Sequence, residues 1–224
     1  MSYNNGPRIV SDNLILHLDA SSYYGYGKWL DLSGYESHAS LINGVTFDAN
    51  DFNGAFVFDA TKAQYAECFL KTTMTTEYSV SVVAKRSAAN VDGTVFSSNY
   101  GTRQNLRFTS GGSVLVVAYD AMGSWSNYYT GTSALSGDIF NIVFTVNNTN
   151  LKIYINNVQK ASTTISSIGP INSTATSVTI GQTGMSWSRQ YFTGSIYNIS
   201  AYNKTLSLSD VDFNYRAIRS KFSM

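Results

Sequence analysis

The sequence contains a single cysteine, Cys68, so the chain cannot form an intramolecular disulfide. It does not need one, because a domain of roughly this size buries about 70–75% of the surface of its unfolded chain. Cys68 lies in the apolar stretch QYAECFL, where we expect a buried and unreactive thiol. The scarcity of cysteine therefore predicts one large domain that is held by its hydrophobic core.

Charged residues are also scarce. They make up 13% of the chain, and the net charge is +1 with neither sign concentrated. Phosphate binding needs a basic face, so we predict no nucleic-acid partner. No segment has the ~20 consecutive apolar residues that cross a bilayer. The opening residues MSYNNGPRIV lack an apolar signal-peptide region. We therefore expect neither membrane insertion nor a signal peptide.

The groups that hydrolytic catalysis uses are few and dispersed. Glu36, Glu67 and Glu77 each stand alone, so no E-x-D-x-x-E run places paired acids on one strand face, as a glycosidase would need. His17 and His38 lack a second His or Cys nearby for a metal, and we expect both to be structural. The sequence predicts that this protein is not an enzyme, and glycan hydrolysis is kept as a third hypothesis.

Short segments of alternating apolar and polar residues are present in abundance, about a dozen in all. The clearest is a hairpin around the turn NNTN, whose inward residues are Ile142, Phe144, Val146, Leu151, Ile153 and Ile155. Turn residues separate the segments, and the chain has only two prolines. This pattern predicts an all-β fold, a two-sheet antiparallel sandwich or jelly roll.

Residues 194–218, GSIYNISAYNKTLSLSDVDFNYRAI, change period halfway along. Strict alternation in the first half would group Ile196, Asn198 and Ser200 on one side and Tyr197, Ile199 and Ala201 on the other. The second half has an apolar stripe at helical spacing, formed by Leu208, Val211, Tyr215 and Ile218. Ser207 and Asp210 form an S-x-x-D start signal. We predict a last strand followed by one short C-terminal helix.

Three stretches resemble a known family. The closing stretch is similar to the end of laminin-G-like, concanavalin A-like jelly rolls, with matches at Gly194, Ile196, Ile199, Tyr202, Asn203, Leu206 and Ser207. WLDLSGYESHASLINGVTF resembles a second family motif, with matches at Trp29, Asp31, Ser33, Gly34, His38, Leu41, Asn43, Gly44 and Phe47. FVFDATKAQYAEC is similar to a third. The resemblance implies a single concanavalin A-like jelly-roll domain over 14–224, preceded by an extended segment, 1–13, for docking or oligomer contacts.

The opening GPRIVSDNLILHLDASSYYGYGKWLDLSG resembles stand-alone domains of this family among bacteriophage structural proteins. That resemblance implies a non-enzymatic virion protein: a capsid decoration protein, a head fibre or a tail-fibre component. It would be assembled in the host cytoplasm and displayed on the virion surface. Its partners would be other virion proteins and copies of itself, for instance in a trimer. The alternative is a freestanding carbohydrate-binding module or adhesin.

Two aromatic loops predict a surface for glycans. YDAMGSWSNYYTGTS supplies Asp120, Trp125, Asn127, Tyr128 and Tyr129, and GMSWSRQYF supplies Trp187 and Arg189. Aromatic faces stack on sugar rings, while neighbouring Asn and Asp side chains bond hydroxyls. The competing interpretation is that these aromatics pack beneath the loops or against a neighbouring subunit.

Calcium is the one metal that the resemblance brings into consideration, since some relatives bind it. The candidate oxygen ligands are Asp31, Asp59 and Asp120. The chain departs from the family in two places, each of which removes a potential anionic ligand. Tyr197 and Asn198 stand where an acidic pair is common, and Gln64 stands where Asp is usual. We therefore predict no cofactor, with calcium as the alternative.

Overall fold

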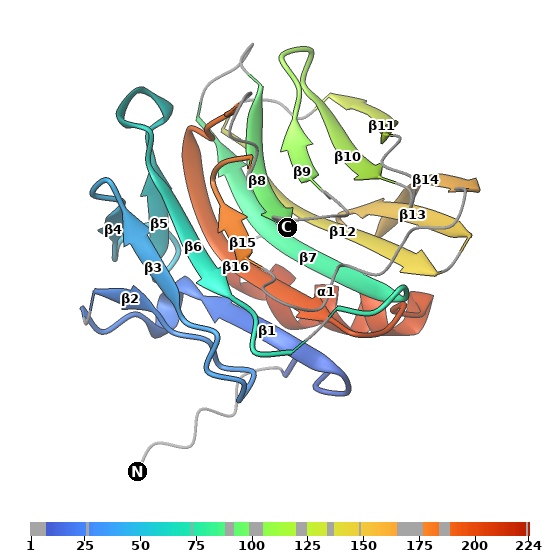
Figure 1. Cartoon of the computed structure of the whole chain (residues 1–224), viewed down its shortest axis with the longest axis horizontal. Helices are drawn as coiled ribbons and strands as arrows, with labels where there is room; N and C mark the ends of the chain where they lie inside the picture. The colour runs from blue at the N-terminus through green and yellow to red at the C-terminus, as the bar shows by residue number, and fades with distance from the viewer. Residues whose placement is uncertain are drawn as a thin grey trace.

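The computed structural model describes residues 8–25, 27–72, 74–87, 92–98, 105–119, 125–133, 137–147, 149–164, 177–183, 189–222 and 224, with the backbone alone for 115–119 and 125–133. In the described part, two eight-stranded antiparallel sheets form a sandwich, and one C-terminal helix lies outside it (Figure 1). The predicted all-β jelly-roll sandwich with a short terminal helix is confirmed.

Sheet A has the order β14 (Val158–Thr164), β13 (Asn150–Ile155), β12 (Ile139–Asn147), β7 (Tyr78–Arg86), β16 (Gly194–Tyr202), β5 (Ala55–Phe58) and β4 (Thr46–Asp48), and β1 (Leu14–Asp19) also pairs with β16. Sheet B has the order β11 (Trp125–Ser133), β10 (Ser113–Tyr119), β9 (Asn105–Phe108), β8 (Gly93–Ser98), β15 (Ser177–Ile180), β6 (Tyr65–Phe69), β3 (Ala39–Ile42) and β2 (Lys28–Trp29). The 3-10 turns η1 (Ala20–Ser22) and η2 (Ala60–Lys62) and the helix α1 (Leu208–Phe222) complete the fold.

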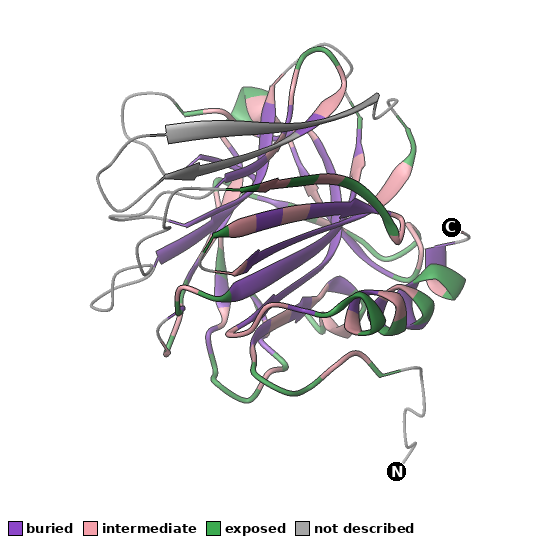
Figure 2. Cartoon of the chain, turned by 90° about the vertical axis from the view of Figure 1, so that its right-hand side faces the viewer, coloured by how far each residue is buried: buried purple, intermediate pink, exposed green. Residues whose placement is uncertain are grey.

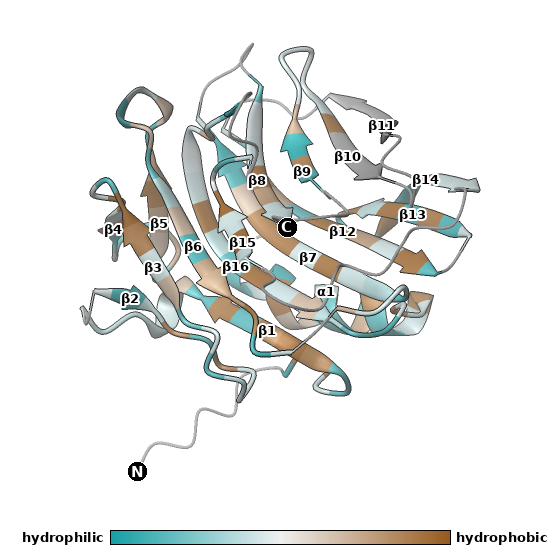
Figure 3. Cartoon of the chain, in the orientation of Figure 1, coloured by the Kyte–Doolittle hydropathy of each residue, from teal (hydrophilic) through white to brown (hydrophobic). Residues whose placement is uncertain are grey.

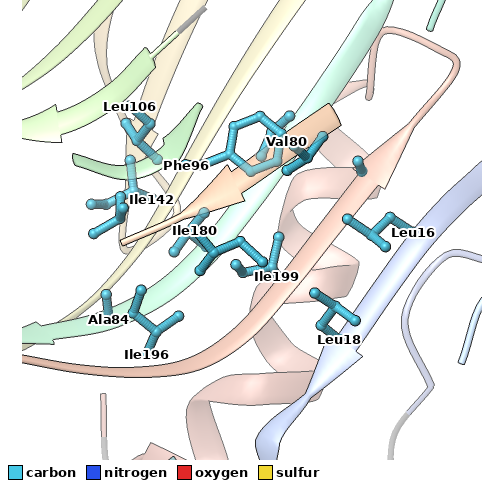
Figure 4. Close-up of a cluster of buried hydrophobic side chains, with 14 of the residues drawn as sticks. Leu16, Leu18, Val80, Ala84, Phe96, Leu106, Ile142, Ile180, Ile196 and Ile199 are labelled. Atoms are coloured by element: carbon cyan, nitrogen blue, oxygen red, sulfur yellow. The ribbon is translucent and has the colours of Figure 1, made fainter. Parts of the chain in front are cut away.

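The hydrophobic core fills the space between the two sheets, because every second residue of each strand points inward. Hydropathy alternates accordingly along strands such as β9 (Figure 3). Aliphatic and aromatic side chains from both sheets meet in one cluster, including Leu16, Val80, Phe96, Leu106, Ile142, Ile180 and Ile199 (Figure 4). Cys68 belongs to this cluster at 1% exposure, and burial raises the pKa of its thiol. The expected burial of this thiol is confirmed.

Strand β16 departs from the strict alternation that we predicted. A bulge between Ile196 and Asn198 inserts one residue relative to β7. Ile196, Ile199 and Ala201 therefore share the inner core, while Tyr197 joins a cluster on the outer face of sheet A. The predicted grouping of Ile196 with Asn198 and Ser200 was wrong, because a bulge shifts the face of every residue that follows it.

Helix α1 begins at the predicted signal. The Ser207 hydroxyl accepts a hydrogen bond from the backbone N–H of Asp210 (3.2 Å), and the Asp210 carboxylate accepts one from the backbone N–H of Ser207 (3.0 Å). The helix lies against the outer face of sheet A (Figure 2). In the described part of the chain, no helix is long and apolar enough to span a membrane.

The buried stripe of α1 differs from the predicted one. Its members are Val211, Asn214, Ala217, Ile218 and Phe222. Leu208 is 63% exposed and Tyr215 is half-buried, so both were wrongly assigned to the stripe. Val211 and Ile218 belong to the stripe as predicted, and Asn214 takes the buried position that was assigned to Tyr215.

Asn214 can be buried because both polar atoms of its amide form hydrogen bonds. It accepts a hydrogen bond from the backbone N–H of Val10 (2.7 Å) and donates one to the hydroxyl of Tyr202 (3.0 Å). Val10 and Leu14 also pack against the cluster that includes Tyr202. The described part of the N-terminal segment is thus fastened on the helix side of sheet A.

A glycine at the start of β16 gives a sharp test of this packing. Gly194 has a φ of +151°, and a Cβ there would meet the backbone oxygen of Lys85 and approach within 2.8 Å of the Phe192 ring. We expect Gly194→Ala to lower the free energy of unfolding by about 3 kcal/mol, measured by urea denaturation. In the matched control, Gly111→Ala, the nearest atom lies 3.9 Å away. Equal stability of the two variants would contradict the packing described.

Candidate functional site

The outer face of sheet B presents a column of three large side chains along β6. Ala66 and Cys68 point into the core, so Tyr65, Glu67 and Phe69 lie on the opposite face of the strand. Phe69 is 57% exposed, and Tyr65 and Glu67 are half-buried. Because alternate residues on a strand are ~7 Å apart, the two aromatic rings are separated by ~13 Å with a carboxylate between them.

A row of polar side chains crosses the sheet at the level of Glu67. The strand register places the members side by side, in the order Ser40, Glu67, Thr179, Ser97 and Asn105. Hydrogen bonds hold the row in place. The Ser177 hydroxyl donates to Glu67 (2.6 Å), and the Ser97 hydroxyl donates to the side-chain oxygen of Asn105. Ser40 is exposed and Glu67 is half-buried, whereas Thr179, Ser97 and Asn105 are each 1% exposed, so the accessible part of the row lies beside the aromatics of β6.

The segment after β15 brings Arg189 to one end of the column. Gln182 and Tyr191 form a β-bridge, which folds residues 189–192 back along the sheet. The Arg189 side chain is exposed and donates a long hydrogen bond to the Tyr191 hydroxyl (3.5 Å). This bond and the nearby Tyr65 raise the pKa of the Arg189 guanidinium. Arg189, a predicted site residue, therefore lies near Tyr65, which the sequence analysis did not identify as part of the site.

Several buried polar atoms near this segment have no hydrogen-bond partner among the described residues. They are Thr94 Oγ1, Arg107 Nε and Gln182 Oε1. Thr94 is the cross-strand neighbour of Arg107, whose Nη1 donates to Gln190 (2.7 Å). A buried polar atom left unpaired costs about 1–3 kcal/mol, so such atoms call for a water or a ligand.

The other predicted glycan residues lie at the edge of the same sheet or outside the described residues. β11 is the edge strand of sheet B, and Asn127 is opposite Val117, which is opposite Asn105 in the polar row. In the same way, Tyr129 pairs with Leu115, and Leu115 pairs with Arg107, so these three residues lie in one row across the sheet. Trp125 pairs with Tyr119, and Tyr128 pairs with Val116, opposite the buried Leu106. Asp120 and Trp187 lie outside the described residues, so this part of the site stays a prediction.

Sequence reasoning missed Tyr65, Glu67 and Phe69 because QYAECFL was classified only as an apolar strand. A signal was available in the alternation of side-chain size. Small residues, Ala66 and Cys68, occupy one parity and large ones the other. In a strand whose small side chains fill the core, the large ones face outward.

Asp31 does not fit a calcium ligand, because both of its oxygens are already used by the protein. Oδ1 accepts hydrogen bonds from the backbone N–H groups of His17 (2.8 Å) and Ser33 (2.9 Å). Oδ2 accepts from the Ser33 hydroxyl (2.8 Å) and the backbone N–H of Ser37 (2.9 Å). The carboxylate, which is 7% exposed, organises the turn between β2 and β3. His38 supports the same turn by accepting from the backbone N–H of Asp31 (3.0 Å).

Asp59 has a similar local role. It caps η2 by accepting bonds from the backbone and hydroxyl of Thr61, which with Lys62 lower the pKa of its carboxyl group. The buried Gln64 donates to the backbone oxygen of Gly44 (2.6 Å), a bond that an aspartate could not make. Among the described residues, no three His, Cys, Asp or Glu side chains gather as a metal site would require.

The face also lacks the geometry of a glycosidase around its acid. The cross-strand neighbours of Glu67 are Ser40 and Thr179, and its neighbours along β6 are Tyr65 and Phe69. None of these is a carboxylate that could serve as the second acid. His17 does not supply a base either, because burial lowers its pKa and its Nδ1 lies 3.3 Å from the Ser200 hydroxyl on sheet A.

Comparison with known families gives one match that covers most of the chain. A profile described as the concanavalin A-like lectin/glucanases superfamily matches residues 42–212. No curated protein sequence matches this chain.

Solved structures with the same fold include toxin binding domains and a glycanase domain. The binding domain of botulinum neurotoxin DC, in complex with rat synaptotagmin II, is 16% identical with a TM-score of 0.74, over 93% of this chain and 52% of that one. The binding domain of Paraclostridial Mosquitocidal Protein 1 is 14% identical with a TM-score of 0.71, over 92% and 52%. This chain thus spans about half the length of these toxin chains.

Domain 4 of AbnA, an extracellular arabinanase from Geobacillus stearothermophilus solved with arabinotriose, is 20% identical with a TM-score of 0.68. The match covers 90% of this chain and 98% of that domain. At these identities the likeness establishes the fold.

The role of Asp31 can be separated from calcium binding by experiment. We expect Asp31→Asn to lower the free energy of unfolding by about 2–3 kcal/mol, because an amide nitrogen would face N–H donors. Asp59→Asn, at a more exposed cap, should cost less. We expect neither calcium nor EDTA to change the melting temperature of the wild-type protein. A calcium-dependent rise that Asp31→Asn abolishes would overturn this assignment.

Proposed function

Since this chain belongs to the concanavalin A-like lectin/glucanase superfamily, we propose that it is a non-catalytic binding domain that holds a saccharide on the outer face of sheet B. The observation that carries the proposal is the column of Tyr65, Glu67 and Phe69 beside a row of hydroxyl and amide side chains. The exposed Phe69 and the half-buried Tyr65 offer apolar faces to sugar rings, and the accessible members of the row, Ser40 and Glu67, offer partners for hydroxyl groups.

The spacing of the column favours an oligosaccharide. Tyr65 and Phe69 are ~13 Å apart along β6, so they contact separate rings of one chain. Glu67 lies between them and retains an oxygen beyond the one that Ser177 occupies. Arg189 and Tyr191 extend the surface past Tyr65. The lone acid within this surface supports binding without hydrolysis.

The solved relatives provide two kinds of ligand to compare. The arabinanase domain was solved with arabinotriose, and the neurotoxin domain with rat synaptotagmin II. A polar face with separated aromatics suits the first kind, because obligate protein interfaces have a more continuous apolar centre. A saccharide is therefore the ligand that we propose, and a protein receptor is the competing one.

We further propose that the domain is displayed on a bacteriophage virion, as a capsid decoration protein, head fibre or tail-fibre component. The support is the resemblance of the opening residues and the position of the N-terminal segment. Within the predicted docking segment, 1–13, Val10 is fastened to Asn214 on the helix side of sheet A, which is the side away from the outer face of sheet B. Partners would then be other virion proteins and further copies of this chain.

A freestanding carbohydrate-binding module is the alternative, and a glycanase the third reading. Recovery of the protein in purified particles separates the first two. Release of reducing sugar from polysaccharides would support the third and refute the non-catalytic reading.

Alanine substitutions on β6 test the saccharide face. We expect Tyr65→Ala and Phe69→Ala each to weaken binding to the best ligand on a glycan array by at least about tenfold, because stacking area is lost. Calorimetry with that ligand and with arabinotriose gives the affinity. Phe213→Ala is the matched control, since Phe213 is 52% exposed on α1, at the other side of the sandwich. Unchanged binding by both β6 variants would refute the site.

Glycan binding by Trp125→Ala and Trp187→Ala, measured on the same array, tests whether the predicted loop aromatics bind the ligand together with the β6 column. Loss of binding in these variants with none in the β6 variants would move the site to the edge of the sheet.

Deletion of residues 2–7 tests the anchor. The deletion retains Val10 and its bond to Asn214, so we expect an unchanged melting temperature. We expect the truncated protein to be missing from purified particles and, in sedimentation, to lose any oligomer that the full chain forms. Its copurification with particles at normal stoichiometry would show that the anchor lies elsewhere.

A further inference from the structure

A pocket lies on the other side of the sandwich, far from the saccharide face just described. It has a volume of about 230 Å³ and lies between the outer face of sheet A and the segment that leads into α1. Its floor is formed by Thr145, Lys152 and Tyr154, and its wall by Leu206, Ser207 and Leu208. The strands that form the floor, β12 to β14, and the start of the helix are seen from the side in Figure 2.

The strand register explains why these floor residues share one face. Thr145 pairs directly with Lys152, and Tyr154 lies two residues farther along β13, opposite Gln159 of β14. Val146 and Ile153, of the other parity, belong to the inner core. The pocket floor is therefore a rigid part of a sheet rather than a loop.

Tyr154 packs its ring against the sheet and the start of the helix, and it also lines this pocket. It is 3% exposed, and burial raises the pKa of its hydroxyl. Among the described residues, no group forms a hydrogen bond with that hydroxyl, although the ring packs with Tyr202 and Leu206. Thr145, which is 1% exposed, likewise lines the pocket. The Tyr154 hydroxyl is not among the buried unpaired atoms of the described residues, so it is accessible to a ligand that enters the pocket.

Lys152 makes the pocket cationic. It is the one charged residue of the lining, and among the described residues it forms no ion pair. Asp210 lies behind the wall, where it bonds Ser207 and pairs with Lys204 (3.6 Å). The carboxylate of Asp210, at the start of the helix, is therefore already paired with the ammonium group of Lys204. Amide side chains at the rim, Asn147, Asn150 and Gln159, can bond hydroxyl groups.

We propose that this pocket is a second binding site, for one acidic sugar unit such as a uronic acid. Lys152 would bind the carboxylate, Tyr154 and the rim amides would bond hydroxyls, and the exposed Leu208 would contact the apolar face of the ring. The volume suits a single ring rather than a chain. The site is independent of the outer face of sheet B, so failure of either proposal leaves the other intact.

The test uses sodium D-glucuronate, with D-glucose and inorganic phosphate as comparison ligands, and measures binding to the full chain by NMR titration. We expect glucuronate to bind at least about tenfold more tightly than glucose, and more weakly as salt rises, because exposed charges are screened. Lys152→Ala should weaken glucuronate binding by at least about fivefold. Lys160→Ala, which removes an exposed lysine of β14 outside the pocket, should leave it unchanged.

Tyr154→Phe separates binding from folding. Its hydroxyl has no described protein partner, so we expect the melting temperature to stay the same or rise while glucuronate affinity falls at least about threefold. Absence of glucuronate binding, or equal binding by Lys152→Ala, would overturn the proposal. Phosphate that binds as tightly as glucuronate would also overturn it, since the pocket would then select an anion and not a sugar.

Discussion

Strand β16 pairs with β7 along one side and with two different strands, β5 and β1, along the other. A regular strand could not serve these neighbours and also place Ile196 and Ile199 in one core, because three residues of separation would put them on opposite faces. The bulge between Ile196 and Asn198 resolves this conflict. Tyr197 is thereby released to the outer face of sheet A, where α1 packs against it.

The helix that covers this outer face determines what each side of the sandwich can do. α1 buries the centre of sheet A through Val211, Ile218 and Phe222, and the segment that leads into it leaves a pocket over β12 to β14. That pocket is lined by Lys152 and Tyr154. Within the described residues no helix packs on sheet B, where Phe69 is exposed and Tyr65 is half-buried on β6. Both proposed sites thus lie on sheets, which hold side chains more rigidly than loops do.

The fold could be predicted from the sequence because strand alternation, the S-x-x-D cap and the closing motif agree with one another. The details that failed have physical reasons. The bulge at Tyr197 cannot be read from the apolar pattern. Ile196 and Ile199 are both apolar, so the sequence is compatible with a regular strand and with a bulged one. Asn214 was passed over because a buried amide is justified only by partners 204 and 12 residues away, Val10 and Tyr202. Long-range hydrogen bonds of this kind are not visible in a local pattern.

The candidate site was predictable only in part, because the sequence does not show which polar groups already form hydrogen bonds within the fold. Asp31 looks like a metal ligand in sequence, yet four donors from the chain saturate its carboxylate. Thr94 attracts no notice in sequence, yet its hydroxyl is buried and has no hydrogen-bond partner among the described residues. An unpaired buried hydroxyl costs about 1–3 kcal/mol, a large fraction of the stability of a domain. Such a cost becomes visible only once the fold shows which polar groups are paired, so no local pattern could have drawn attention to Thr94.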